Sequence, residues 1–161
     1  MTAYSQLPDL SPALPELFLA AGALALLMIG VFGGRRITPY VTALSVALLA
    51  VAALPLLLPA QFGITATTTF HGAFVLDGFA RYLKLLTLVG SGFAIAMSVA
   101  FARNENFERF EYPVLIVLST LGMLLMLSAN DLITLYLGLE LSSLALYVIA
   151  AFNRDSVRST E

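Results

Sequence analysis

The sequence is poor in charged residues. Asp, Glu, Lys and Arg make up only 11% of its 161 residues, whereas a soluble globular protein carries about 25%. Hydrophobic residues make up 60%, and the mean hydropathy is +0.93. Such a chain cannot cover itself with water-compatible side chains, so we expect lipid to be its solvent. The same composition excludes a disordered chain and a basic surface for nucleic acid.

Cysteine is absent, and His71 is the single histidine. Without cysteine the chain has no disulfide, no thiolate metal site, no cysteine nucleophile and no ligand set for an iron–sulfur cluster. One histidine cannot build a His-based metal cluster, and there is no G-x-G-x-x-G nucleotide fingerprint. We therefore predict no metal ion and no cofactor in this chain.

Long apolar stretches occupy most of the sequence. A hydrocarbon core of about 30 Å is crossed by about 20 helical residues at 1.5 Å each. We therefore predict an all-α fold, a polytopic transmembrane bundle that forms a single membrane domain. Its five membrane-spanning helices are predicted at residues 14–32, 37–58, 79–101, 113–129 and 132–152.

The basic residues predict an orientation, because cytoplasmic loops accumulate Lys and Arg. Most of them follow the first, third and fifth spans, which places the N-terminus on the periplasmic side. Arg81 and Lys84 are exceptions at the outer end of the third span, and Asp77 is spaced to pair with Arg81. The basic residues on the predicted cytoplasmic side are Arg35, Arg36, Arg103, Arg109, Arg154 and Arg158.

Two of the connections between the spans contain residues that predict local structure. The longer one, 59–78, contains a Thr-rich stretch at 64–70 that could pair as a small hairpin or lie on the surface. The short connection between the last two spans ends with Asp131, which we expect to cap the fifth helix.

Glu140 is the ionisable residue that stands out. It lies eight positions after Leu132, about 12 Å into a core of roughly 30 Å. Placing a charge there costs about 2.5–3.5 kcal/mol on insertion scales, and intramembrane carboxylates usually have a function. We predict that Glu140 handles protons or ions. The alternative is a protonated carboxylic acid that donates one hydrogen bond between helices as structural glue.

A polar stripe runs along this fifth span. Its members follow i, i+4, i+7 and i+11 spacing and are Tyr136, Glu140, Ser143 and Tyr147. We expect the stripe to line a hydrated or hydrogen-bonded interior, which makes its other members secondary candidates for the proton path. The tyrosines could instead be packing aromatics. Gly138 and the serine pair at 142 and 143 are expected to let a neighbouring helix come close.

Lys84, the only lysine, is a further candidate for the proton path. Its position near a helix end favours a side chain that snorkels to the outer interface as an anchor. Glu16, directly after Pro15, is expected at the surface, where a carboxylate complements a helix N-terminus. His71 is expected to be a surface or loop-packing residue, with a pH-sensing or proton-entry role as the alternative.

Three segments resemble a known family: "ALPELFLA", "FVLDGFARYLKLLTLVGSG" and, most specifically, "SANDLITLYLGLELSSLALYVIAAFNRDSVRSTE". They are similar to the antiporter-like membrane subunits, of the subunit N type, of bacterial proton-pumping NADH:quinone oxidoreductase, respiratory complex I. The resemblance covers nearly the whole chain. It is weakest in the 59–78 connection.

The resemblance implies a membrane-arm subunit descended from cation/proton antiporters, with two inverted repeats that each carry a proton half-channel. Glu140 matches the family's fifth-helix glutamate, which modulates the charge of a lysine on the seventh helix. The family has many more helices than five, so the seventh-helix lysine and the second repeat are not among these residues. We interpret the chain as an N-terminal portion of a longer subunit.

The implied function is proton translocation coupled to electron transfer from NADH to quinone, as a translocase subunit in the bacterial inner membrane. NADH, FMN, iron–sulfur clusters and quinone are then expected in other subunits. The expected partners are the lipid bilayer and other membrane-arm subunits, and not nucleic acid. Alternatives are a subunit of a related cation/proton antiporter or membrane-bound hydrogenase, and a structural or assembly membrane protein.

Overall fold

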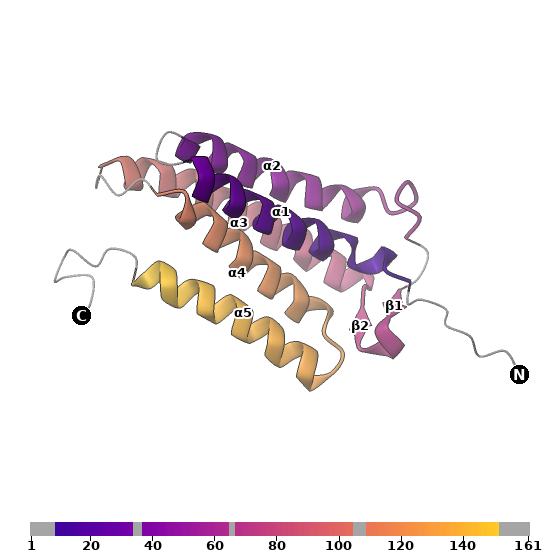
Figure 1. Cartoon of the computed structure of the whole chain (residues 1–161). Coiled ribbons are helices and arrows are strands. Elements are labelled where there is room, and N and C mark those ends of the chain that lie inside the picture. Colours follow the sequence, from indigo (N-terminus) through magenta and orange to yellow (C-terminus); the bar gives the residue numbers. More distant parts are fainter. Residues whose placement is uncertain (1–8, 34–36, 65–66, 105–108, 152–161) are drawn as a thin grey trace, which may run out of the picture.

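The computed structural model describes residues 9–33, 37–64, 67–104 and 109–151. Five long helices dominate it, with a short two-stranded hairpin between the second and third (Figure 1). The helices are α1 Leu14–Gly33, α2 Thr38–Leu57, α3 Gly78–Asn104, α4 Glu111–Ser128 and α5 Leu132–Ala150. The short elements are η1 Ser11–Ala13, β1 Thr68–Thr69, η3 Phe70–Gly72 and β2 Phe74–Val75.

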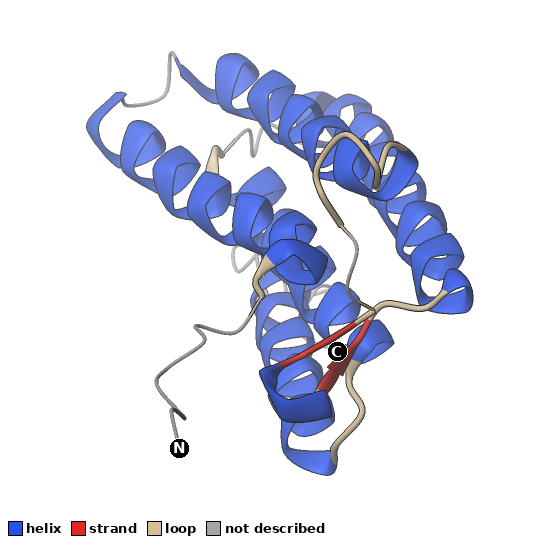
Figure 2. Ribbon diagram, turned by 90° about the vertical axis from the view of Figure 1, so that its right-hand side faces the viewer, coloured by secondary structure: helices blue, strands red, loops and turns tan. Residues whose placement is uncertain are grey.

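All five long helices are long and apolar enough to cross a membrane, which confirms the helical part of the predicted fold class. Successive helices run in opposite directions along the bundle (Figure 1). One end therefore gathers η1, the hairpin, the start of α3 and the α4–α5 connection. We call this the hairpin end, and Figure 2 views the bundle from it.

Prolines mark the helix starts. Pro15, Pro39 and Pro113 all lie in a first turn, where the missing N–H has no partner in any case. Pro55 lies inside α2 only a few residues before the helix ends at Leu57. Because a proline in that position removes one backbone hydrogen bond, it suits a last turn better than a helix centre.

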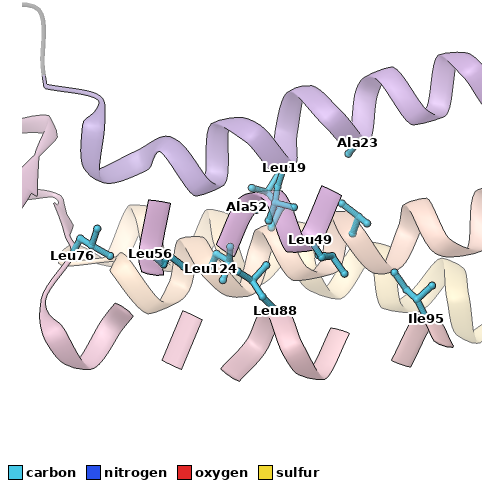
Figure 3. Close-up of a cluster of buried hydrophobic side chains, with 11 residues drawn as sticks. Leu19, Ala23, Leu49, Ala52, Leu56, Leu76, Leu88, Ile95 and Leu124 are labelled. Atoms are coloured by element: carbon cyan, nitrogen blue, oxygen red, sulfur yellow. The ribbon is translucent and has the colours of Figure 1, made fainter. Parts of the chain in front are cut away.

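The core lies between α1, α2, α3 and α4 (Figure 3). Each of these helices contributes leucine or alanine side chains that are almost completely buried. Because lipid chains are as apolar as leucine, these side chains stabilise a membrane bundle by close packing between helices and not by transfer out of water. The labelled members are Leu19, Ala23, Leu49, Ala52, Leu56, Leu76, Leu88, Ile95 and Leu124.

α5 lies at the edge of the bundle and packs mainly on α4. Only 17% of its apolar window is buried, against 50% for α4. A Cβ added to Gly122 would lie 2.6 Å from the Ser142 backbone nitrogen, so the two helices touch backbone to backbone. Gly138 meets the Gly122 carbonyl oxygen in the same way. The predicted close approach is confirmed at Gly138 and Ser142. It is wrong for Ser143, which is not among the buried residues of α5.

The hairpin pairs Thr68 with Val75 and Thr69 with Phe74 in antiparallel register. Its turn passes through Phe70 and His71, both with positive φ, and then Gly72 at φ 89°. The end of the Thr-rich stretch, Thr68–Thr69, thus forms one strand of a hairpin, and Phe74–Val75, which follow the stretch, form the other. Phe74 also forms an isolated bridge with Ala129, which ties the hairpin to the α4–α5 connection.

The α4–α5 contact predicts a sharp difference between two glycine-to-alanine changes. Gly122→Ala should destabilise the chain by about 1–3 kcal/mol, because the new methyl group collides with backbone that cannot rotate away. Gly90→Ala should leave stability unchanged or raise it by about 0.5–1 kcal/mol, because Gly90 lies in α3 with open space around it. Unfolding in detergent micelles, followed by circular dichroism, measures both. Equal stability of the two variants would contradict this packing.

Candidate functional site

Glu16 and Lys84 form an ion pair inside the bundle. The Lys84 Nζ donates to Glu16 Oε1 at 2.6 Å, and the pair joins the first turn of α1 to the second turn of α3. Lys84 is 0% exposed and Glu16 is 4% exposed. Two opposite charges are therefore neutralised by direct contact in surroundings from which water is excluded.

Phe74 completes the surroundings of this pair. Its ring, itself buried, lies with its centroid 4.7 Å from Lys84 Nζ, close enough for a cation–π interaction. The second carboxylate oxygen of Glu16, Oε2, is buried without a hydrogen-bond partner among the described residues. Glu16 Oε1 thus accepts the hydrogen bond from Lys84, and Oε2 could accept one from a further donor.

This geometry corrects two predictions. Lys84 does not snorkel to an interface, since its side chain is fully buried against Glu16. Glu16 does lie in the first turn of α1 as expected, but it is buried and not at the surface. The physical reason is the partner: each residue alone would prefer water at a helix end, whereas the two together can be desolvated. The sequence offered one indication of this pair: an acidic and a basic residue, 68 positions apart, each lie near the start of a predicted helix.

Asp77 also differs from expectation. It does not pair with Arg81 in the described structure. Its Oδ1 instead accepts a hydrogen bond from the Ala80 backbone nitrogen at 2.6 Å, which satisfies a free donor at the start of α3. Asp131 acts in the same way for α5, since its Oδ1 accepts from the Thr134 nitrogen at 2.6 Å. The predicted cap on α5 is confirmed.

Glu140 lies near the middle of α5, and its side chain is half-buried. The buried residues of α5, Gly138, Ser142 and Ala145, form the face that packs on α4. Helical geometry of 100° per residue puts Glu140 on the opposite face. Its carboxylate therefore points away from the four-helix core.

The rest of the polar stripe shares this outward face. Tyr136 and Tyr147 are 60% and 69% exposed, and the Tyr136 hydroxyl interacts with the Glu140 carboxylate one turn along the helix. The Ser143 hydroxyl donates to the Leu139 carbonyl oxygen of its own helix. The expectation that the stripe lines an interior is wrong for the five helices described, because the helix turns its small residues toward α4 instead.

Hydroxyl groups join α3, α4 and α5 on the packed side. Thr120 donates to Ser91 at 2.7 Å, and Ser119 lies 3.1 Å from the Ser142 hydroxyl. A cavity of about 480 Å³ opens between the same helices. Leu146 and Ile149 are the α5 residues that line it, and Glu140 is not among its lining residues.

Metal ligands do not gather in the part of the chain that the structure describes: no three His, Asp or Glu side chains there form a group that could hold an ion. His71 is exposed in the hairpin turn, as a surface residue should be. Among the described residues, the candidates for a functional ionisable group are thus the buried Glu16–Lys84 pair and the outward-facing Glu140.

The ion pair predicts a distinctive pattern in a double-mutant cycle. Glu16→Leu or Lys84→Met alone should destabilise the chain by about 3–5 kcal/mol, because each leaves the other charge buried without its partner. The double variant Glu16→Leu/Lys84→Met should recover most of this loss. Chemical unfolding in detergent micelles provides the free energies. Losses that simply add in the double variant would show that the two side chains do not interact.

The cap on α5 predicts a pH effect. Hydrogen bonds from Thr134, involving its side chain and its backbone N–H, hold the pKa of Asp131 below the usual value. A lowered folded pKa means that the stabilisation is complete above the unfolded pKa and is lost as pH falls through the folded pKa. The stability of the wild type relative to Asp131→Asn should therefore decline on acidification. Thermal unfolding at a series of pH values tests this, and a constant difference would refute it.

Known proteins are similar in sequence to the part of the chain that contains the α5 cap and Glu140. Residues 129–161, which include the cap and Glu140, match the family model described as "NADH:quinone oxidoreductase/Mrp antiporter, TM". Among curated proteins, NADH-quinone oxidoreductase subunit N 1 of Rhizobium meliloti is 58% identical over 161 residues. Subunit N of Methylobacterium nodulans is 55% identical over 161 residues, and that of Parvibaculum lavamentivorans is 51% identical over 159 residues.

These alignments cover between 96% and 100% of the chain but only 32% to 33% of each relative. The chain thus spans about one third of the length of the curated relatives that it matches. Homology at this level extends across all five helices and both candidate charge sites. The chain is homologous along its whole length to about one third of NADH-quinone oxidoreductase subunit N.

Proposed function

We propose that these five helices are part of a membrane-arm subunit of NADH:quinone oxidoreductase and that they take part in proton translocation. In this proposal Glu140 is the proton-handling carboxylate. The observation that carries the proposal is the position of Glu140 at mid-helix, in the segment that matches the antiporter family model, on a face without helix cover from the described bundle.

The outward direction of Glu140 supports a role shared with further protein. A carboxylate turned toward lipid at this depth costs about 2.5–3.5 kcal/mol, whereas a carboxylate beside a cation is stabilised. The relatives are about three times as long as this chain. The face of Glu140, Tyr136, Ser143 and Tyr147 therefore suits contact with the remaining part of such a subunit, where the family resemblance implies a seventh-helix lysine.

The buried Glu16–Lys84 pair has a different part in this proposal. Because its charges cancel within the bundle, it links α1 to α3 without requiring a partner from outside. Lys84 is therefore not assigned to the same proton path as Glu140. It links two helices that both pack on α4, the helix against which α5 lies.

The setting follows from the same proposal. The chain is a multi-pass protein of the bacterial inner membrane with its N-terminus on the periplasmic side, as the distribution of basic residues favours. Its partners are lipid and the other membrane-arm subunits. NADH, FMN, iron–sulfur clusters and quinone bind elsewhere in the complex, since this chain offers neither cysteine ligands nor a nucleotide fingerprint.

A subunit of a related cation/proton antiporter is the second candidate, because the matching family model covers both kinds of protein in its description. The relatives favour the first candidate, since all those described above are named subunit N of NADH-quinone oxidoreductase. Dependence of transport on NADH oxidation separates the two.

Glu140→Gln in the full-length gene tests the proposed role. Gln keeps the size and hydrogen bonding of the side chain but carries no charge. In inverted membrane vesicles, NADH oxidation should persist while NADH-driven acidification falls about tenfold or more, the scale on which a lost proton-transfer group acts. Both rates are recorded in the same sample.

Glu111→Gln provides the matched control, because it is the same chemical change at the start of α4. Its acidification should equal that of the wild type. If the Glu140 variant also pumps at the wild-type rate, the carboxylate is structural glue and the proposed role is wrong.

A further inference from the structure

The start of α5 is held by the hairpin. The Asn130 side-chain amide donates to the Gly72 carbonyl oxygen at 2.8 Å, and the Asn130 backbone nitrogen donates to the Ala73 carbonyl oxygen at 2.9 Å. The next hairpin residue, Phe74, forms the bridge with Ala129. Three consecutive hairpin residues thus contact the two residues that precede the α5 cap.

Packing within the bundle holds this part of α5 weakly. The first buried residue of the helix is Gly138, in its second turn. Before it, Leu132 and Ile133 are 81% and 72% exposed. A helix start without buried side chains is held by few apolar contacts and is free to shift. The hairpin contacts therefore have a large share in setting where α5 begins.

The same hairpin reaches the ion pair at its other side. Phe74 presents its ring to Lys84 Nζ at 4.7 Å, while its backbone is bridged to Ala129. One buried residue thus touches the cation of the pair and the connection that leads into α5. A series of contacts runs from Glu16 through Lys84 and Phe74 to Ala129, two residues before Asp131, the cap of α5. Asn130, between Ala129 and Asp131, is bonded to the hairpin residues Gly72 and Ala73.

We propose that the hairpin links the Glu16–Lys84 pair to α5, and that Phe74 and Asn130 are positioning residues for Glu140. This inference rests on the proposed function of Glu140. Glu140 lies two and a half helical turns after the cap, so a shift or rotation at the helix start is carried along the helix to the carboxylate. Residues at the hairpin end thereby control how Glu140 meets its partner.

The test uses Phe74→Leu and Asn130→Ala in the full-length gene. Phe74→Leu keeps an apolar side chain and the backbone bridge but removes the aromatic face from Lys84. Asn130→Ala removes the side-chain bond to Gly72 and keeps the backbone bond to Ala73. Gln61→Ala is the control, because Gln61 is an exposed amide in the connection that leads to the same hairpin.

The readout is the number of protons moved per NADH oxidised by assembled complex in inverted vesicles. A purely structural defect lowers assembly and both rates together, whereas a positioning defect lowers this ratio. We expect each variant to reduce the ratio about twofold or more. Because both residues hold the same hairpin against the same connection into α5, the double variant should be no worse than the lower single variant. Gln61→Ala should match the wild type.

Three outcomes overturn the inference. Ratios equal to that of the wild type in both variants would show that the hairpin does not position Glu140. Reductions that multiply in the double variant would show that the two residues act separately. A normal ratio in Glu140→Gln would show that the proposed function of Glu140 is wrong, and the inference would fail with it. A low ratio in Glu140→Gln with normal ratios in the hairpin variants would contradict the inference alone. If Asn130→Ala fails to assemble, Phe74→Leu decides.

Discussion

A charge buried inside a helix bundle needs a partner, and the described residues contain one such pair, Glu16 and Lys84. Glu16 and Lys84 cancel each other at 2.6 Å between the first and third helices. This contact allows two helix-end residues to be buried and links α1 to α3, which both pack on α2 and α4. The Phe74 ring lies against the Lys84 ammonium. Because breaking such a pair leaves a bare charge, both residues are needed together. The ion pair thereby fixes the end of the bundle at which the hairpin and the α5 cap also lie.

Glu140 presents the opposite case. α5 turns its small residues, such as Gly138, toward α4 and leaves its carboxylate on the far face. A helix with close backbone contact on one side and an ionisable group on the other is suited to packing between two groups of helices. In our proposal α1 to α4 form one of these groups, and protein outside the described residues forms the other. The hairpin adds a second hold on α5, at the end where the helix has no buried side chains.

Hydropathy and local signals were enough to predict the five helices, the Asp131 cap and the close approach at Gly138, because each depends on residues near one another in sequence. The pairing of Glu16 with Lys84 was not predicted, since a single charge near a helix end is equally compatible with the surface. Periodicity also placed Tyr136, Glu140, Ser143 and Tyr147 correctly on one face. It could not show that this face is turned away from α4, because that depends on which helix packs there. The proton-handling role of Glu140 remains a prediction.

The central claim is that protein outside these five helices covers the face of Glu140. Spin labelling at position 143, on the same stripe, measures this directly, because these 161 residues contain no cysteine that would compete for the label. The account predicts that a nitroxide there is open to lipid-dissolved oxygen in the five-helix chain and shielded from it in the full-length subunit. A label at Leu24, which is exposed on α1, gives the lipid-facing reference in the five-helix chain. Equal oxygen access at position 143 in the two proteins would contradict the account.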